Sequence, residues 1–260
     1  GSDAAKAFAL FGDQLDGSGG GSFNQFGDLS SDSLFVDLQF NYDLGKVANM
    51  GRHRLVFGIQ YEREDLTDNN VNVAGQLINV LQEDDFENFG IYIQDEWQLS
   101  PKLEIVPGLR VDDTNTLDSA VWSPRIAARL LASDELTLRA NVSTGFLAPR
   151  VFSEDTHVDN LGGQPVDTVN VEDLQEERSS TIALGFDYRP KSLNGQFLTG
   201  FQIYFTELED SFFIEEPGEN PTIENGRIKV ERSNTDGTTV RGFEWDINYQ
   251  VNDHWNITSG

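Results

Sequence analysis

Hydrophobic and polar residues alternate with a period of two along most of this chain, which is the pattern of a β-strand with one apolar and one polar face. In the segment 33–44 the even positions are apolar, and Phe35 is the exception. In the segment 86–99 the exception is Asp95, which falls on the apolar face. The alternation predicts strands at 33–44, 52–65, 86–99, 103–113, 122–132, 136–146, 176–189, 196–209 and 238–251, and a tenth beginning near Trp255.

These predicted strands are long, about 10 residues or more, whereas strands of soluble domains cluster at about 5 to 6 residues. A tilted strand needs about 9 to 11 residues to cross a bilayer. Short and long connections also alternate, as in an outer-membrane barrel with tight turns at one end and long loops at the other. The short connections are 45–51, 100–102, 133–135, 190–195 and 252–254, and the long ones are 66–85, 114–121, 147–175 and 210–237.

We therefore predict an all-β fold, an antiparallel up-and-down transmembrane β-barrel that is present here as a partial barrel of about ten strands. Its apolar face would meet lipid and its polar face a water-filled lumen. A soluble β-sandwich would instead turn the apolar face inward, and periodicity alone does not separate the two. Aromatic residues near strand ends favour the barrel, where they would form interfacial girdles; they are Trp97, Trp122, Tyr188, Tyr249 and Trp255.

The ends of the chain indicate a fragment. The chain begins without a start Met or an export signal, and it stops at Gly260 just after a new alternating segment has begun. Residues 16–22 have the composition of a flexible linker. The predicted organisation is a linker-like N-terminal segment, 1–31, followed by a partial barrel, 32–260.

Composition narrows the function further. The chain has 44 acidic and 18 basic residues, a net charge of −26 and no Cys. So acidic a chain lacks a basic surface that could bind the phosphates of nucleic acid. Without Cys it has no disulfides and no thiol nucleophile. Apolar runs are far shorter than the about 20 residues of a membrane-spanning helix. High negative charge also suggests a saline habitat, in which the stability of the protein would rise with salt.

Signatures of catalysis are missing, so we predict neither an enzyme nor a bound cofactor. The three His lie in no metal-binding spacing and no phosphate-cradling glycine loop is present. One cluster in the longest predicted loop could hold Ca²⁺ or a transition metal, namely Glu154, Asp155, His157 and Asp159. The alternative is an acidic loop solvated by water.

Charged residues on the predicted lumen side form a second candidate set. Arg125, Arg129 and Arg139 share the polar parity of adjacent strands. Glu96 and Glu244 supply the opposite charge, together with Asp112 and Asp246. These side chains could contact a polar ligand or an internal domain. They could equally form a hydrated wall in which the charges pair with one another.

Several sequence blocks resemble the barrel of TonB-dependent outer-membrane receptors, and their order and spacing match as a set over roughly residues 33–260. The stretch 152–163 is reminiscent of such receptors from Bacteroidetes-like bacteria. The blocks are GIYIQDEW (90–97), SPKL (100–103), PGLRVD (107–112), SPR (123–125), LTLRA (136–140), TGFLAP (144–149), LQEERS (174–179) and TVRGFE (239–244).

The resemblance implies active import across the outer membrane of a Gram-negative bacterium. Members of the family bind a scarce nutrient, such as an iron–siderophore chelate, a corrinoid or a glycan, and release it inward when the TonB complex pulls on an N-terminal plug. The implied partners are outer-membrane lipid, the TonB complex and a small nutrient ligand. The sequence departs from the family in having no recognisable plug domain, TonB box or terminal barrel strand. A passive porin-like barrel and a secreted carbohydrate-binding β-sandwich remain as alternatives.

Overall fold

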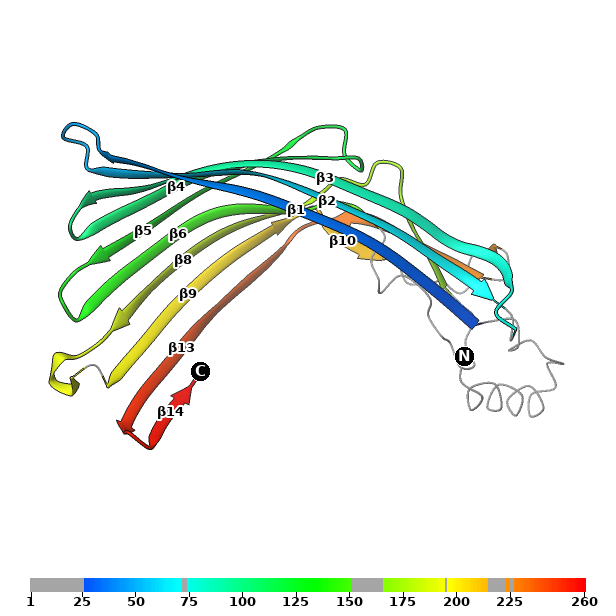
Figure 1. Cartoon of the computed structure of the whole chain (residues 1–260). Coiled ribbons are helices and arrows are strands. Elements are labelled where there is room, and N and C mark those ends of the chain that lie inside the picture. The colour runs from blue at the N-terminus through cyan, green and yellow to red at the C-terminus, as the bar shows by residue number, and fades with distance from the viewer. Residues whose placement is uncertain (1–25, 72–73, 151–165, 195, 215–222, 225–226) are drawn as a thin grey trace.

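A single curved antiparallel sheet dominates the computed structural model, which describes residues 26–71, 74–150, 166–194, 196–214, 223–224 and 227–260. Its ten strands follow one another in sequence order across the sheet, and β1 and β14 form its two edges (Figure 1). The strands are β1 (Phe26–Lys46), β2 (Arg52–Val71), β3 (Leu77–Ser100), β4 (Leu103–Thr114), β5 (Val121–Leu131), β6 (Leu136–Leu147), β8 (Glu177–Tyr188), β9 (Phe197–Glu209), β13 (Thr238–Asn252) and β14 (Trp255–Ser259). The ten predicted strands and the meander are thereby confirmed.

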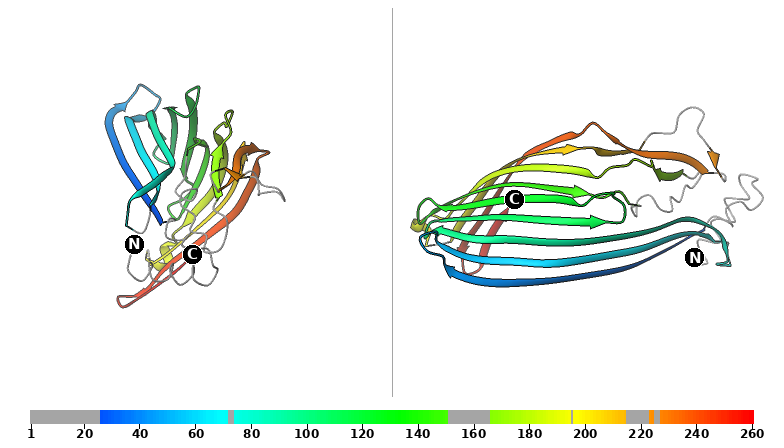
Figure 2. Two further views of the ribbon diagram at one scale, coloured as in Figure 1. Left: turned by 90° about the vertical axis from the view of Figure 1, so that its right-hand side faces the viewer. Right: turned by 90° about the horizontal axis from the view of Figure 1, so that it is seen from above.

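The sheet is an open arch when viewed along its strands, with β1 on one side and β13 on the other (Figure 2). Short connections gather at one end, called here the turn end. One of them carries a single 3-10 turn, Lys191–Leu193. The opposite end, called here the mouth end, carries the longer connections. The predicted alternation of short and long connections thus corresponds to two different ends of the sheet.

Two of the predicted long connections contain strands that the alternation did not indicate. A small second sheet at the mouth end has the order β10-β12-β11, with β7 paired to β12 in parallel. Its strands are β7 (Val166–Asn170), β10 (Ser211–Ile214), β11 (Ile223–Glu224) and β12 (Arg227–Thr235). These strands are short, and their residues lack the sustained apolar face by which the long strands were recognised.

The first three strands also run further toward the mouth than predicted. β1 begins at Phe26, so residues 26–31 are in a strand and not in a linker-like segment. Most of the predicted loop 66–85 belongs to β2 and β3, which pair as far as Val71 and Leu77. The period-two pattern is lost in these extensions, where runs such as Asp68-Asn69-Asn70 interrupt it, while the backbone pairing of the ladder continues.

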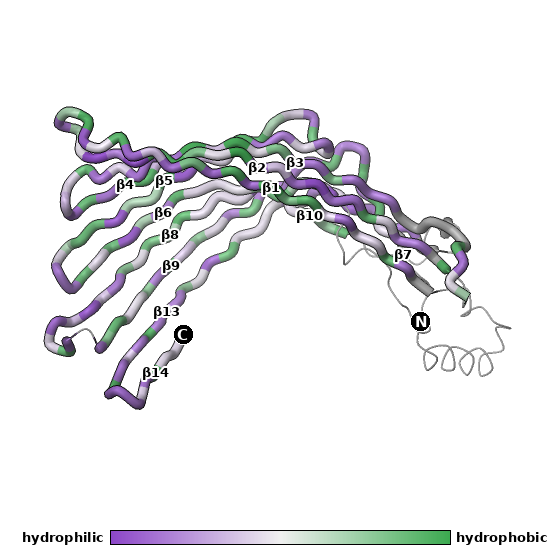
Figure 3. Tube along the Cα trace, in the orientation of Figure 1, coloured by the Kyte–Doolittle hydropathy of each residue, from purple (hydrophilic) through white to green (hydrophobic). Residues whose placement is uncertain are grey.

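The apolar side of the sheet is its outer surface. Phe57, Ile91 and Trp245 are 41%, 48% and 59% exposed, and in the described residues no second layer covers them. A sandwich would have buried these side chains, so this observation decides between the two predicted arrangements. Hydropathy alternates along each long strand in Figure 3. None of the described helical segments is long and apolar enough to cross a membrane.

The apolar band crosses the hydrogen-bonded rows obliquely. One outward-facing row runs from His53 and Trp97 at the turn end of β2 and β3 to Ile203 and Phe243, well inside β9 and β13. Hydrogen-bonded rows run across the strands roughly at right angles. An apolar band that crosses these rows obliquely therefore means that the strands are tilted relative to the band, as in membrane barrels.

Asp95, which interrupts the apolar pattern of β3, has a partner on the same outer face. Its Oδ2 lies 2.6 Å from Nδ1 of His53 on β2. The His53 ring stacks on Trp97 at a centroid distance of 5.4 Å. The Trp97 indole N–H in turn donates a hydrogen bond to the Met50 carbonyl oxygen in the turn between β1 and β2. Asp95 is therefore paired through Oδ2 next to the turn end, where the interface would lie, while Asp95 Oδ1 and His53 Nε2 are buried without a hydrogen-bond partner among the described residues.

Candidate functional site

The polar face of the large sheet is concave, and we call it the inner wall. Arg150, which follows β6, lies within reach of Glu62 and Glu64 on β2, four strands away in the sheet. Such a contact can bridge the strands only on the concave side of a curved sheet. The parity of Glu62 and Glu64 therefore identifies the inner face of β2, and strand pairing extends this assignment to the other strands.

Ion pairs within the wall account for three of the predicted lumen residues. Arg129 Nη2 lies 2.9 Å from Glu104 Oε2, and Arg139 Nη2 lies 2.9 Å from Asp187 Oδ1. Arg129 and Arg139 face each other directly across β5 and β6, so each cation is balanced by the acid on its other side. Glu96 pairs with Arg54, 3.4 Å away. For these residues the hydrated, self-paired wall is the arrangement observed.

Two more of the predicted residues, Arg125 and Glu244, lie on the same wall without such pairs. Arg125 is exposed on β5, beside Gly108, and Glu244 is exposed on β13. Within the described part of the chain neither side chain has an ion-pair partner. Both charges are thus available to a molecule inside the arch.

Asp112 has a buried carboxylate on the wall, with a side chain that is 1% exposed. Arg110 holds it through two guanidinium nitrogens, with Nε–Oδ2 at 2.7 Å and Nη2–Oδ1 at 2.6 Å. Asn88 donates a further hydrogen bond to Oδ1 at 3.0 Å. The Arg110 guanidinium lies against Gly90, where a Cβ would come within 2.3 Å of Nη2. The absence of a side chain at residue 90 lets this cation lie flat along the wall.

A shallow hollow interrupts the wall between β4 and β9. It has a volume of about 350 Å³. Small residues account for the hollow, chiefly Ala127, Ala183 and Gly185, while Glu104, Arg129 and Arg139 border it. The hollow on the concave side is therefore apolar at its base and charged at its edges.

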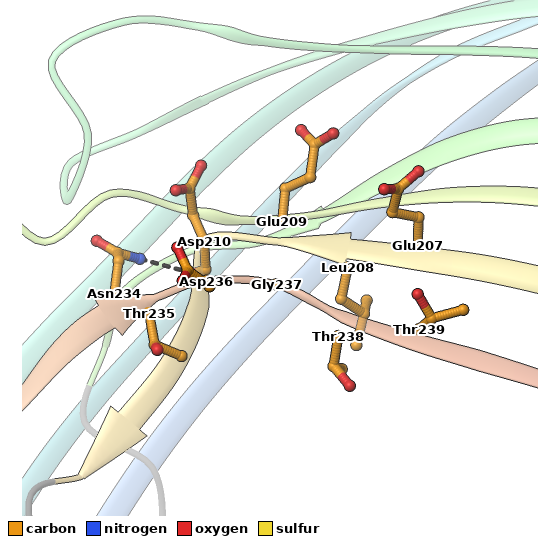
Figure 4. A pocket seen from close by; sticks show the side chains of 10 residues that line it. All are labelled: Glu207, Leu208, Glu209, Asp210, Asn234, Thr235, Asp236, Gly237, Thr238 and Thr239. Atoms are coloured by element: carbon orange, nitrogen blue, oxygen red, sulfur yellow. Dashed lines mark hydrogen bonds between the residues drawn. The ribbon is translucent and has the colours of Figure 1, made fainter.

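A second cavity of about 540 Å³ lies where β9 ends and β13 begins (Figure 4). Its lining is acidic, with Glu207, Glu209, Asp210 and Asp236. Asn234 holds the corner together by donating from Nδ2 to the Asp210 carbonyl at 2.7 Å. Within the described residues no group of three metal-ligating side chains is gathered at this or any other place. The predicted metal candidates Glu154, Asp155, His157 and Asp159 lie outside the described residues.

The mouth contains functional candidates that the sequence pattern did not indicate. Arg150 contacts Glu62, Glu64 and the ring of Phe86, and Arg232 on β12 is 4% exposed. These residues come from irregular connections and from strand extensions, where periodicity carries no signal. The motif TGFLAP ends directly before Arg150, but nothing in its sequence identifies these contacts.

At the turn end, Lys191 and Asp134 join two neighbouring turns. The Lys191 ammonium donates a hydrogen bond to the Asp134 carboxylate, and the Lys191 backbone N–H donates to Glu135 Oε1 at 2.6 Å. The hydrogen bond and the positive charge lower the pKa of Asp134, while the same contact raises the pKa of Lys191. These turns therefore carry a charged clasp outside the apolar band.

Comparison with known families agrees with this geometry. Residues 3–260 match the family described as TonB dependent receptor-like, beta-barrel. The chain belongs to this TonB-dependent receptor family. Its place is the outer membrane of a Gram-negative bacterium. The expected membership of the family is thereby confirmed.

Individual relatives of this TonB-dependent receptor chain are similar over part of their length. The iron-regulated outer membrane virulence protein of Vibrio cholerae is 28% identical over 167 residues, 62% of this chain and 24% of that protein. The ferric enterobactin receptor PirA of Pseudomonas aeruginosa is 28% identical over 109 residues, 38% of this chain and 15% of that protein. The chain thus spans about a quarter or less of these curated relatives.

Solved structures have the same fold. The siderophore receptor PirA from Pseudomonas aeruginosa superposes with a TM-score of 0.65 at 19% identity, covering 86% of this chain and 41% of that one. A mutant of the ferric enterobactin receptor PfeA in complex with enterobactin, also from Pseudomonas aeruginosa, gives a TM-score of 0.66 at 15% identity, covering 88% and 35%. At these identities the likeness concerns the fold of the receptor barrel.

Proposed function

We propose that this chain forms part of an outer-membrane receptor for TonB-dependent uptake of a scarce nutrient, with an iron–siderophore chelate as the first candidate. The observation that carries the proposal is the arch itself, which is apolar on its convex face and polar, ion-paired and hollowed on its concave face. Such a wall suits a passage that guides a hydrated solute past lipid. The names of the relatives, an iron-regulated protein and a ferric enterobactin receptor, support the choice of nutrient.

Partners follow from the same proposal. Outer-membrane lipid would cover the convex face, and the TonB complex would act through a plug domain within the arch. Arg125 and Glu244 are the strongest candidates for contact with the plug or a polar ligand, because the described residues leave their charges unpaired. Arg129, Arg139 and Glu96 would take part as members of a charged wall. In this role the protein binds and releases its ligand without catalysis.

Uptake of radiolabelled iron by cells with and without the gene tests the proposal, with ferric enterobactin as the probe. Iron should accumulate only in cells that have the gene, TonB and an energised inner membrane. Accumulation that persists after addition of a protonophore would favour the passive porin-like alternative. A full-length product that stays soluble and monomeric without detergent would contradict the proposal.

A further inference from the structure

Arg150 joins parts of the mouth that are distant in both sequence and sheet order. Its Nη1 lies 3.5 Å from Glu62 Oε1 and 3.5 Å from Glu64 Oε2, both on β2. Its Cζ lies 4.9 Å from the centre of the Phe86 ring on β3. Its backbone carbonyl accepts a hydrogen bond from Arg232 Nη1 on β12 at 3.2 Å. The residue therefore connects the extended strands β2 and β3 with the small sheet.

The two sides of this connection differ in their surroundings. On the side of the small sheet, Arg232 is buried and also donates to Asn170 Oδ1 on β7 at 3.3 Å. Ala148 and Pro149, which lead into Arg150, are buried as well. On the side of β2, the side chains of Arg150, Glu62 and Glu64 are 27%, 38% and 32% exposed. Ion pairs in contact with water are weak and are screened by salt.

We propose that Arg150 is a positioning residue that holds the β2–β3 extension toward the small sheet and so sets the width of the receptor's mouth. The buried contacts with Arg232 keep the backbone of Arg150 on the small sheet. The half-exposed contacts with Glu62 and Glu64 form and release. Without the guanidinium these two carboxylates, two residues apart on one strand face, would repel each other and any acidic neighbour. The inference rests on the proposed function only in calling the opening a mouth.

The test measures the mouth directly in the full-length protein in outer-membrane vesicles. The chain has no Cys, so spin labels can be placed at Thr67→Cys on β2 and Thr235→Cys on β12, with any Cys elsewhere replaced by Ser. Pulsed electron–electron double resonance then gives the distribution of distances between the two spin labels, with no nutrient added. Arg150→Ala should create a longer-distance population that becomes the major one.

Arg63→Ala is the matched control. Arg63 lies between Glu62 and Glu64 on the same strand, but it faces outward and pairs with Asp65 at 2.9 Å and Glu87 at 3.5 Å. This variant removes the same charge and should leave the distribution unchanged. Raising KCl from about 0.05 to 1 M should shift the wild-type distribution in the direction of Arg150→Ala, since the screening length falls several-fold over that range.

Two further variants separate positioning from general loss of structure. The double variant Glu62→Gln, Glu64→Gln keeps Arg150 on Phe86 and should widen the distribution as Arg150→Ala does. Exchanging the charges, with Arg150→Glu, Glu62→Arg and Glu64→Arg together, should restore the shorter distance. The proposal is overturned if Arg150→Ala matches Arg63→Ala, or if neither further variant behaves as expected. Because no nutrient is present, this outcome is independent of the uptake assay.

Discussion

The phenol ring of Tyr92 lies across Gly58 on the neighbouring strand, its direct partner in the register of β2 and β3. A Cβ at residue 58 would stand 2.6 Å from the Tyr92 hydroxyl oxygen and 2.5 Å from the Leu38 carbonyl oxygen. Over the glycine, the hydroxyl reaches β1 and lies 3.3 Å from Asp37 Oδ1 and 3.4 Å from Gln39 Oε1. One side chain thereby couples three strands of the inner wall.

Gly58→Ala should therefore destabilise the barrel. The added methyl group must displace both the Tyr92 ring and a backbone carbonyl, and forced packing of this kind costs about 1 to 3 kcal/mol. The measurement is the temperature at which the full-length protein loses its folded, fast-migrating band in electrophoresis. Gly145→Ala is the control, because its Cβ would meet only the Ser179 hydroxyl, at 3.0 Å. Equal shifts for the two variants would contradict the explanation.

Two arginines of the same wall should differ sharply in their effect on stability. Arg110→Ala leaves the buried carboxylate of Asp112 without its cation, and breaking a buried pair costs about 3 to 5 kcal/mol. Arg129→Ala breaks a pair whose side chains are 54% and 31% exposed, so we expect about 0 to 1 kcal/mol. Denaturant unfolding in lipid vesicles measures both free energies.

A second variant separates the effect of an unpaired buried charge from loss of packing, even if Arg110→Ala does not fold. Arg110→Met combined with Asp112→Leu removes both charges and should recover most of the lost stability. If the double variant were as unstable as Arg110→Ala, loss of packing and not an unpaired charge would be the cause.

Because the apolar face points outward, a new charge should destabilise the protein more on the outer face than on the inner face. Ile203 on β9 faces outward between Phe201 and Phe205, and its partner on β13 is Phe243. Ile203→Arg should cost about 2 to 4 kcal/mol if this part of the band meets the centre of the bilayer. Glu244→Arg, one residue along from Phe243 on the inner face, should change the unfolding free energy far less. A larger loss for Glu244→Arg would reverse the assignment of the two faces.

Acid should weaken the clasp between the two turns. The hydrogen bond from Lys191 lowers the pKa of Asp134 below the 3.8 of an unperturbed aspartate. Because the folded-state pKa is the lower one, the contribution of Asp134 to stability is present above pH 3.8 and is lost as pH falls through the folded-state value. The carboxyl carbon shift of labelled Asp134 reports this titration. Lys191→Gln should move the midpoint back toward 3.8, whereas Arg189→Gln should not.

For the charged residues of the inner wall, the alternation of polar and apolar positions predicts the face of the sheet but not the ion-pair partners. Strand parity placed Arg129 and Arg139 on the polar face, but it could not reveal that they oppose each other and need Glu104 and Asp187 for balance. Which carboxylate reaches which guanidinium depends on the register between strands. Register depends on the geometry of the turn and on hydrogen bonds between whole strands, as between β6 and β8, so it cannot be read from the period-two pattern of one strand.

The pattern of residues was enough to predict the ten long strands, the alternation of their faces and the meander that connects them. A period of two is a local property, and one apolar face per strand leaves few ways to arrange the sheet. The folded arrangement was needed to show that the apolar face is the convex one, and that Arg150 meets Glu62 and Glu64 across the inner wall. Curvature and cross-wall contacts arise from tilt and register summed over many strands, which no single segment encodes.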